Sequence, residues 1–262
     1  MKKYVTRRQR QEINEKKRKN ITIILLVIVL LFIIGIAVIP RLIKKEKRDL
    51  SKEKLQGSDS VVDSDPGSIP EYSGKDYVLL NDGNPEFNTW DIENIAGEHY
   101  SDLDSFGRCG TAFAMLDRDM MPNEKRGEIG QIKPTGWVQN KYEGIIDSEP
   151  PYLYNRSHLI AYALTGQNAN EKNLITGTRY MNATTMLPWE ETVMRYLDYS
   201  ENHVLYRVTP YFKGKELLAR GVEIEAYSVE DEGEGVCFHV FVYNIQPGIE
   251  LNYQTGDNRI KE

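Results

Sequence analysis

The chain has 262 residues, of which 40% are hydrophobic and 27% charged. This composition suits one globular domain, and the length excludes two large domains. Charge is divided unevenly: residues 1–48 hold 14 Lys or Arg and three Asp or Glu, which leaves 19 basic and 36 acidic residues, a net charge of −17, in the remaining 214. Such an acidic part argues against binding nucleic acid mainly through charge, although an enzyme needs only a local basic groove.

Residues 21–39 form an apolar run that contains no charged residue and only one hydroxyl, that of Thr22. Nineteen helical residues span roughly 28 Å, close to the hydrocarbon thickness of a bilayer. A signal-peptide core is usually about 7–15 residues long and ends at a small-residue cleavage site. The run is longer, and residues 37–40 form no such site. We therefore predict an uncleaved transmembrane anchor at residues 21–40.

The flanking charges predict the orientation of this anchor. Residues 1–20 hold nine Lys or Arg, whereas residues 41–48 hold five. The more basic flank stays in the cytoplasm, which places the C-terminal part outside a single-pass cell membrane protein. Residues 41–76 are charged and rich in Ser and Gly, so we predict a flexible linker. The predicted organisation is a cytoplasmic segment at 1–20, the anchor, this linker and an extracytoplasmic domain at 77–262.

Three strands are predicted near the C-terminus. Val204, Tyr206 and Val208 alternate with less apolar residues, and residues 222–226 alternate with glutamates. Residues 235–244 are apolar on both faces, which is typical of a more buried strand. The turn at residues 229–235 joins the last two strands as a hairpin, so we expect an α+β fold with an antiparallel sheet core.

A helix precedes these strands. Apolar residues recur at a spacing of three or four from Met186 through Trp189 and Val193 to Tyr196. Pro188 cannot lie inside a regular helix, so we expect it in the first turn of a new one.

The two cysteines, Cys109 and Cys237, both lie in apolar segments that read as strands. In a domain outside the cell they could form a disulfide, or they could be two buried free thiols. We predict that the two lie within disulfide reach.

The chain contains four histidines: His99, His158, His203 and His239. Three of them fall in strand or turn patterns typical of packed or surface residues. His158 differs, because Asn155 and Arg156 place polar groups beside it in an otherwise apolar stretch. Ser157 is adjacent, but neighbouring side chains of a strand point to opposite faces and a G-x-S-x-G elbow is absent, so a serine hydrolase is disfavoured.

A second polar segment follows at residues 171–182. Asparagine offers a neutral oxygen that suits a hard cation such as Mg²⁺ better than zinc, although it also serves in turns and caps. The sequence has no HExxH motif, no paired CxxC, no P-loop and no EF-hand loop. Zinc binding and nucleotide hydrolysis are therefore unsupported.

The segments NRSH at 155–158 and NLITGTRYMN at 173–182 resemble the DNA/RNA non-specific endonuclease family. These are ββα-metal, or His-Me finger, nucleases, whose signature is Asp-Arg-Gly-His. The resemblance is closest to membrane-anchored DNA-entry nucleases and secreted DNases of Gram-positive bacteria. It covers about residues 77–256, including segments at 107–112, 129–137, 203–212 and 243–256. It implies an antiparallel sheet core with a ββα-metal catalytic motif.

The resemblance assigns the general base to His158, the metal-ligand asparagine to Asn182 and a second active-site asparagine to Asn173. It assigns the helix carboxylate near the metal to Glu190. On a regular helix Glu190 lies about 80° from Asn182, whereas Glu191 lies opposite.

Arg156 takes the place of the motif arginine in this resemblance. The chain departs from the signature with Asn155 in place of Asp and Ser157 in place of Gly. Among the basic residues outside the motif, Arg126 and Lys133 are candidates for contacts with substrate phosphates.

The resemblance implies hydrolysis of DNA and RNA without sequence preference, with Mg²⁺ as cofactor and Mn²⁺ as a possible substitute. His158 would take a proton from water, and the products would carry 5′-phosphates. The alternatives are a non-catalytic surface module that binds DNA for uptake or adhesion, and a phosphodiesterase for small substrates. The binding module is disfavoured because His158, Asn173 and Asn182 are all present at the family spacing.

Overall fold

The structure, a computed structural model, describes residues 69–262. The predicted cytoplasmic segment, the anchor at 21–40 and the linker up to residue 68 lie outside the described residues. No helix within residues 69–262 has the length and apolar character needed to cross a membrane.

The described elements follow one another in this order: β1 Tyr77–Leu79, η1 Asn81–Gly83, α3 Thr89–Asn94, β2 Gly97–Tyr100, β3 Ala112–Leu116, η2 Arg118–Met120, β4 Tyr154–His158, α4 Tyr162–Thr165, η3 Glu171–Asn173, β5 Leu174–Thr178, η4 Met181–Thr185, α5 Leu187–Tyr199, β6 Val204–Tyr211, β7 Gly221–Ser228, β8 Cys237–Tyr243, β9 Ile249–Leu251 and β10 Asn258–Ile260. The mixed content and the antiparallel pairing confirm the predicted α+β class.

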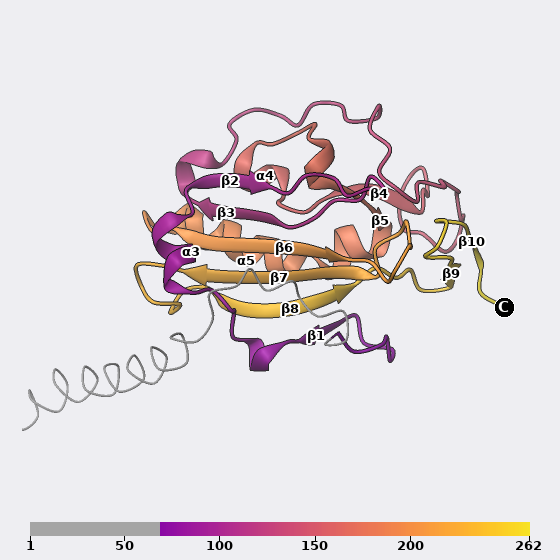
Figure 1. Cartoon of the computed structure of the whole chain (residues 1–262). Coiled ribbons are helices and arrows are strands. Elements are labelled where there is room, and N and C mark those ends of the chain that lie inside the picture. Colours follow the sequence, from indigo (N-terminus) through magenta and orange to yellow (C-terminus); the bar gives the residue numbers. More distant parts are fainter. Residues whose placement is uncertain (1–68) are drawn as a thin grey trace, which may run out of the picture. The chain divides into compact units, whose positions relative to one another are not determined.

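A six-stranded antiparallel sheet in the order β1-β8-β7-β6-β3-β2 forms the centre of the domain (Figure 1). Strands β6 and β7 are those predicted from alternation, β8 is the strand predicted from its apolar residues on both faces, and β7 and β8 form the expected hairpin. Their registers place Val208, Ile224 and Val240 side by side, all fully buried. Each such side chain contributes roughly 1.5–3 kcal/mol by leaving water. β8 is buried on both faces, as its apolar sequence predicted.

Strands β4 and β5 form a separate antiparallel pair that leads through η4 into α5, which makes a ββα unit. Figure 1 shows α5 behind β6 and β7. Val193 and Leu197 of α5 are fully buried in the main core cluster together with Tyr206 and Ile224 of the sheet. The core therefore fixes the ββα unit against one face of the central sheet.

Helix α5 begins as predicted, with Pro188 in its first turn, where a missing N–H breaks no helical hydrogen bond. The turn before it is a π-helix, in which Met186 N–H donates to Met181 C=O at 2.9 Å. This wider turn changes the rotation per residue. The regular-helix angle predicted between Asn182 and Glu190 is therefore wrong.

The prediction that the two cysteines lie within disulfide reach is wrong, and of the two alternatives the free thiols are confirmed. Cys237 is the first residue of β8. In the strand register it pairs with Tyr227 of β7, which pairs with Leu205 of β6, which in turn pairs with Met115 of β3. Three strand spacings amount to about 14 Å, beyond the Cα separation of about 7 Å that a disulfide tolerates. Cys109 lies farther still, before β3 rather than in a strand.

The folded domain begins earlier than predicted. The ring of Tyr72 packs edge-on against Tyr243 at 5.3 Å, and Tyr243 Oη donates to the carbonyl of Pro70 at 2.7 Å. Tyr180 Oη donates to the Asp76 carboxylate at 2.9 Å. The end of the segment predicted as linker is therefore part of the domain.

Candidate active site

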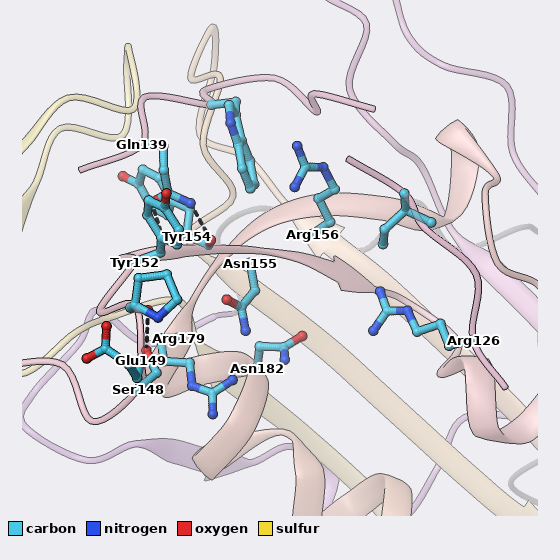
Figure 2. A pocket seen from close by; sticks show the side chains of 13 residues that line it. Arg126, Gln139, Ser148, Glu149, Tyr152, Tyr154, Asn155, Arg156, Arg179 and Asn182 are labelled. Carbon is cyan, nitrogen blue, oxygen red and sulfur yellow. Dashed lines mark hydrogen bonds between the residues drawn. The ribbon is translucent and has the colours of Figure 1, made fainter. Parts of the chain in front are cut away.

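A cavity of about 610 Å³ lies along β4 and η4. It is lined by Arg126, Ile129, Trp137, Gln139, Ser148, Glu149, Pro150, Tyr152, Tyr154, Asn155, Arg156, Arg179 and Asn182. Figure 2 shows Asn155 and Asn182 near its middle, Arg126 at one end, and Ser148, Glu149 and Tyr152 at the other. Three of the predicted site residues, Arg126, Arg156 and Asn182, therefore line one cavity.

Asn182 is carried by the π-turn, and hydrogen bonds to side chains beyond β8 hold the corner that leads into this turn. Asn244 Oδ1 accepts from Thr178 N–H at 2.9 Å, and Gln246 Oε1 accepts from Tyr180 N–H at 3.1 Å. Asn244 is fully buried. Sequence reasoning did not single out either residue, although both lie in the 243–256 segment of the resemblance.

The amides of Asn155 and Asn182 face the cavity (Figure 2). Neither side chain forms a hydrogen bond within residues 69–262, although both are half-buried. Two neutral oxygens without protein partners suit a hard cation that keeps most of its water, as Mg²⁺ does. The donor set contains no thiolate, imidazole or carboxylate, so it does not resemble a structural zinc site.

His158 ends β4 and is buried. Its Nε2 lies 2.9 Å from the carbonyl oxygen of Asn168, and its Nδ1 lies 3.3 Å from Nη2 of Arg126. A carbonyl oxygen only accepts, so the hydrogen belongs on Nε2 and the lone pair on Nδ1. Burial is the main cause that lowers the pKa of His158 to about 4; the charge of Arg126 acts in the same direction, and the hydrogen bond to the Asn168 carbonyl opposes both. The ring is therefore neutral at pH 7, with Nδ1 able to accept a proton.

Arg156 lies in the wall of the cavity. Its guanidinium donates to the carbonyls of Ile132 and Gly130, the latter at 2.7 Å, and lies 4.2 Å over the ring of Trp137. These contacts attach the loop at residues 129–137 to β4. The structure thus gives the predicted motif arginine a clear positioning contact.

Asn173 lies outside the cavity and is fully buried. Its Oδ1 accepts from Ile160 N–H at 2.8 Å, its Nδ2 donates to Ile160 C=O at 3.0 Å, and its own carbonyl accepts from Leu159 N–H at 2.9 Å. These three bonds fix the chain where it leaves His158. The structure therefore connects Asn173 to the site through the position of the histidine.

Glu190 does not line the cavity either. It is buried in α5, whereas Glu191 is exposed. Burial, together with a smaller contribution from the charge of Glu191, raises the pKa of Glu190 to about 8. The Tyr206 hydroxyl, which interacts electrostatically with Glu190, is buried and has no hydrogen-bond partner within residues 69–262.

Two further basic residues lie at positions that the sequence did not predict. Lys133, predicted to contact phosphate, lines a second cavity of about 310 Å³ with Cys109 and Pro134. Arg179 lines the main cavity three residues before Asn182, and sequence reasoning overlooked it. Its position inside the NLITGTRYMN segment was the available signal.

The raised pKa of Glu190 predicts a pH-dependent stability. Between pH 4.5 and 8 the folded protein keeps a proton that the unfolded chain has lost, so the unfolding free energy falls as pH rises across this range and levels off above pH 8. In EDTA, raising the pH from about 5 to about 9 should cost wild type about 4 kcal/mol of unfolding free energy that Glu190→Gln retains. Urea denaturation at a series of pH values measures the difference.

Glu191→Gln is the matched control, since this neighbouring carboxylate is exposed. Because burial contributes more than Glu191 to the raised pKa of Glu190, this variant should keep most of the wild-type fall in stability. A Glu190→Gln profile parallel to that of wild type would show that Glu190 ionises normally in the folded protein.

Residues 88–230, more than half of the chain, match the family model of the DNA/RNA non-specific endonucleases. The chain belongs to this family. This membership confirms the prediction made from the NRSH and NLITGTRYMN segments.

Similar proteins carry nuclease names. A deoxyribonuclease of Streptococcus dysgalactiae subsp. equisimilis is 28% identical over 198 residues, which cover 60% of the chain and 59% of that relative. The match therefore spans less than two thirds of the length of that deoxyribonuclease. NucA from Streptococcus agalactiae, solved with a magnesium ion, is 27% identical with a TM-score of 0.61 over 70% of the chain and 86% of NucA. Sda1 nuclease, solved with a zinc ion, is 26% identical with a TM-score of 0.58 over 71% of the chain and 97% of Sda1.

The departure from the family signature at Ser157 has a steric explanation. Ser157 Oγ is buried on the face of β4 opposite His158 and has no hydrogen-bond partner within residues 69–262. A Cβ on Gly177 of the paired strand would overlap Ser157 Oγ and approach Met181 within 2.7 Å. The serine therefore fills space left by a glycine across the strand pair. This geometry agrees with the rejection of a serine hydrolase.

Proposed function

We propose that the protein is a metal-dependent endonuclease that hydrolyses phosphodiester bonds of DNA, and also of RNA, without sequence preference. The observation that carries the proposal is a buried neutral histidine whose acceptor Nδ1 lies against Arg126, a residue that lines the cavity. The same cavity presents two amides that have no hydrogen-bond partner within residues 69–262. The nuclease names of the relatives support a nucleic-acid substrate.

In the proposed reaction, Nδ1 of His158 takes a proton from the attacking water. The water oxygen forms a bond to phosphorus while the bond from phosphorus to the 3′ oxygen breaks. The 3′ oxygen leaves with the bonding electron pair and takes a proton from solvent, which gives a 3′-hydroxyl and a 5′-phosphate. The carbonyl of Asn168 holds the Nε2–H and stabilises the positive charge that develops on the ring. Arg126, which donates to Nδ1 in the free protein, is placed to move to a substrate phosphate and leave room for water.

Asn182, with Asn155 beside it, would hold a divalent cation such as Mg²⁺, with Mn²⁺ as a substitute. When bound, such an ion supplies positive charge opposite the phosphorane and the departing oxygen. NucA was solved with magnesium and Sda1 with zinc, which supports a divalent ion without fixing which one.

Cutting without sequence preference fits the polar groups of the cavity. Gln139 has the side chain best suited to read a base edge, but both ends of its amide bind the backbone of Tyr154, at 2.6 and 2.9 Å. The arginines offer contacts to phosphates, which carry no sequence information. We also propose that residues 21–40 anchor the protein and that the nuclease domain lies outside the membrane, on the strength of the apolar run and its flanking charges.

The deciding experiment is digestion of nucleic acid by the purified full-length chain. Supercoiled plasmid, linear duplex and RNA should all be degraded in Mg²⁺ or Mn²⁺, and EDTA should stop the reaction. Wall-free cells that express the chain should degrade plasmid added to the medium, and protease treatment of these cells should remove the activity.

Each rival predicts a different result. If the chain binds DNA but leaves plasmid intact with every divalent metal from neutral to mildly alkaline pH, the binding-module function replaces the nuclease. Cleavage restricted to small phosphodiesters would retain the fold and reject the substrate. Degradation of plasmid only after lysis would reject the outward topology.

A further inference from the structure

Three aromatic residues line the cavity that contains Asn182, and two of them have structural contacts. Trp137 is covered by the guanidinium of Arg156 at 4.2 Å. Tyr154 is 2% exposed and its hydroxyl donates to Gly256 C=O at 2.8 Å. Tyr152 differs: it is 41% exposed, and its hydroxyl forms no hydrogen bond within residues 69–262. Its ring is therefore available to a ligand.

The exposed ring of Tyr152 is nevertheless held in place. Its N–H donates to Pro150 C=O at 2.8 Å, and an isolated β-bridge pairs it with Lys141. The ammonium of Lys141 lies 4.9 Å from the ring centroid. A ring held before binding loses little conformational entropy when a flat ligand stacks on it.

Charge separates the two ends of the cavity. Arg126 lies at one end, and Asn182 lies in the middle with Arg179 near it (Figure 2). The Tyr152 end carries Glu149, which is exposed and forms no ion pair within residues 69–262. A carboxylate disfavours a phosphate at that end but not an uncharged base. A strand with a phosphate at Asn182 would therefore place a nucleobase toward Tyr152.

We propose that Tyr152 is a stacking platform for a nucleobase next to the scissile phosphate. This inference rests on the proposed nuclease function and identifies one subsite of it. Every purine and pyrimidine has a flat face, so stacking adds affinity without selecting a sequence. Stacking also does not depend on net charge, which matters for a folded part that is strongly acidic. The base must leave its own stack, so the platform acts on single strands.

The test uses the full-length chain and single-stranded DNA oligonucleotides with one cleavable phosphodiester among resistant phosphorothioate linkages. One oligonucleotide is complete, and two others carry an abasic sugar on the 5′ or the 3′ side of the cleavable bond. Wild type should lose roughly 5- to 100-fold in kcat/KM on one abasic substrate, the range expected for one base–aromatic stack. Tyr152→Ala should lose a similar factor on the complete oligonucleotide and nothing further on that abasic one.

Two control variants test whether the effect depends on the aromatic ring of Tyr152. Tyr152→Phe retains the ring and should behave as wild type. Tyr199→Ala removes a tyrosine that is 88% exposed at the end of α5, outside the cavity, and should also change nothing.

The possible failures are distinguishable. If wild type cleaves all three oligonucleotides equally well, the stacking subsite is rejected and the nuclease function stands. If Tyr152→Ala loses the same factor on complete and abasic substrates, its effect is structural and the subsite is again rejected. If wild type cleaves none of them but degrades plasmid, the stacking subsite is rejected and the nuclease function stands. If it also leaves plasmid intact, both proposals fail.

Discussion

Replacement of His158 by alanine should lower kcat/KM for DNA cleavage by about 10²–10⁴-fold, the usual contribution of a positioned general base. The loss follows from the geometry of the ring, whose Nε2 is committed to the Asn168 carbonyl and whose Nδ1 alone accepts a proton. DNA binding should persist, because the imidazole is not the main phosphate contact. Initial rates on plasmid and a separate binding titration measure the two effects.

The pH profile of the wild type provides a second measure of the same group. The base acts only when neutral, and burial holds the pKa of His158 at about 4. The rise of kcat/KM with pH should therefore lie near pH 4 rather than near the ordinary histidine value of about 6.5. The His158→Ala variant should lack this rise.

His99→Ala serves as the control, since this histidine is exposed on β2 and does not line the cavity. It should retain wild-type rates. A His158→Ala variant that cleaves within threefold of wild type would place the general base on another residue.

Replacement of Asn182 by alanine should abolish cleavage in Mg²⁺ while leaving the Tm of the metal-free protein nearly unchanged. The structure supports both halves of this expectation. The Asn182 side chain faces the cavity, yet it makes no hydrogen bond within residues 69–262 whose loss would destabilise the fold. Nuclease assays and thermal unfolding in EDTA measure the two quantities.

Metal binding can be followed without any substrate. A cation that binds only the folded state raises Tm with concentration. Added Mg²⁺ should raise the Tm of wild type and of Asn94→Ala, a control at the end of α3, but not that of Asn182→Ala. Near-normal cleavage by Asn182→Ala would move the metal to other ligands.

Local pattern was sufficient for much of the fold. Alternation along Val204, Tyr206 and Val208 reports a buried face directly, and the strand lies where it was predicted. Pro188 constrains its own backbone, so the start of α5 was also readable from the sequence. Both features depend on neighbours within a few residues.

The site was harder to predict from the sequence, because its contacts join segments that lie far apart in the chain. Nothing near Arg156 indicates that its guanidinium binds the carbonyls of Gly130 and Ile132. The support of the Asn182 turn comes from Asn244, more than 60 residues later. The π-turn was missed because a periodicity argument assumes regular helix from Asn182 to Glu190. A family resemblance indicated the residues but not these contacts.

The contact between Ser157 and Gly177 changes how the signature of this site should be understood. The family signature has glycine before the histidine, but what β4 and β5 constrain physically is the space that Ser157 and Gly177 share between them. The hydroxymethyl group of Ser157 occupies this space, and Gly177 has no side chain that would compete for it. Substitutions at the two positions are therefore expected to be coupled rather than additive. A motif defined by the space that these two positions share would include this chain. A motif that requires glycine before the histidine would exclude it.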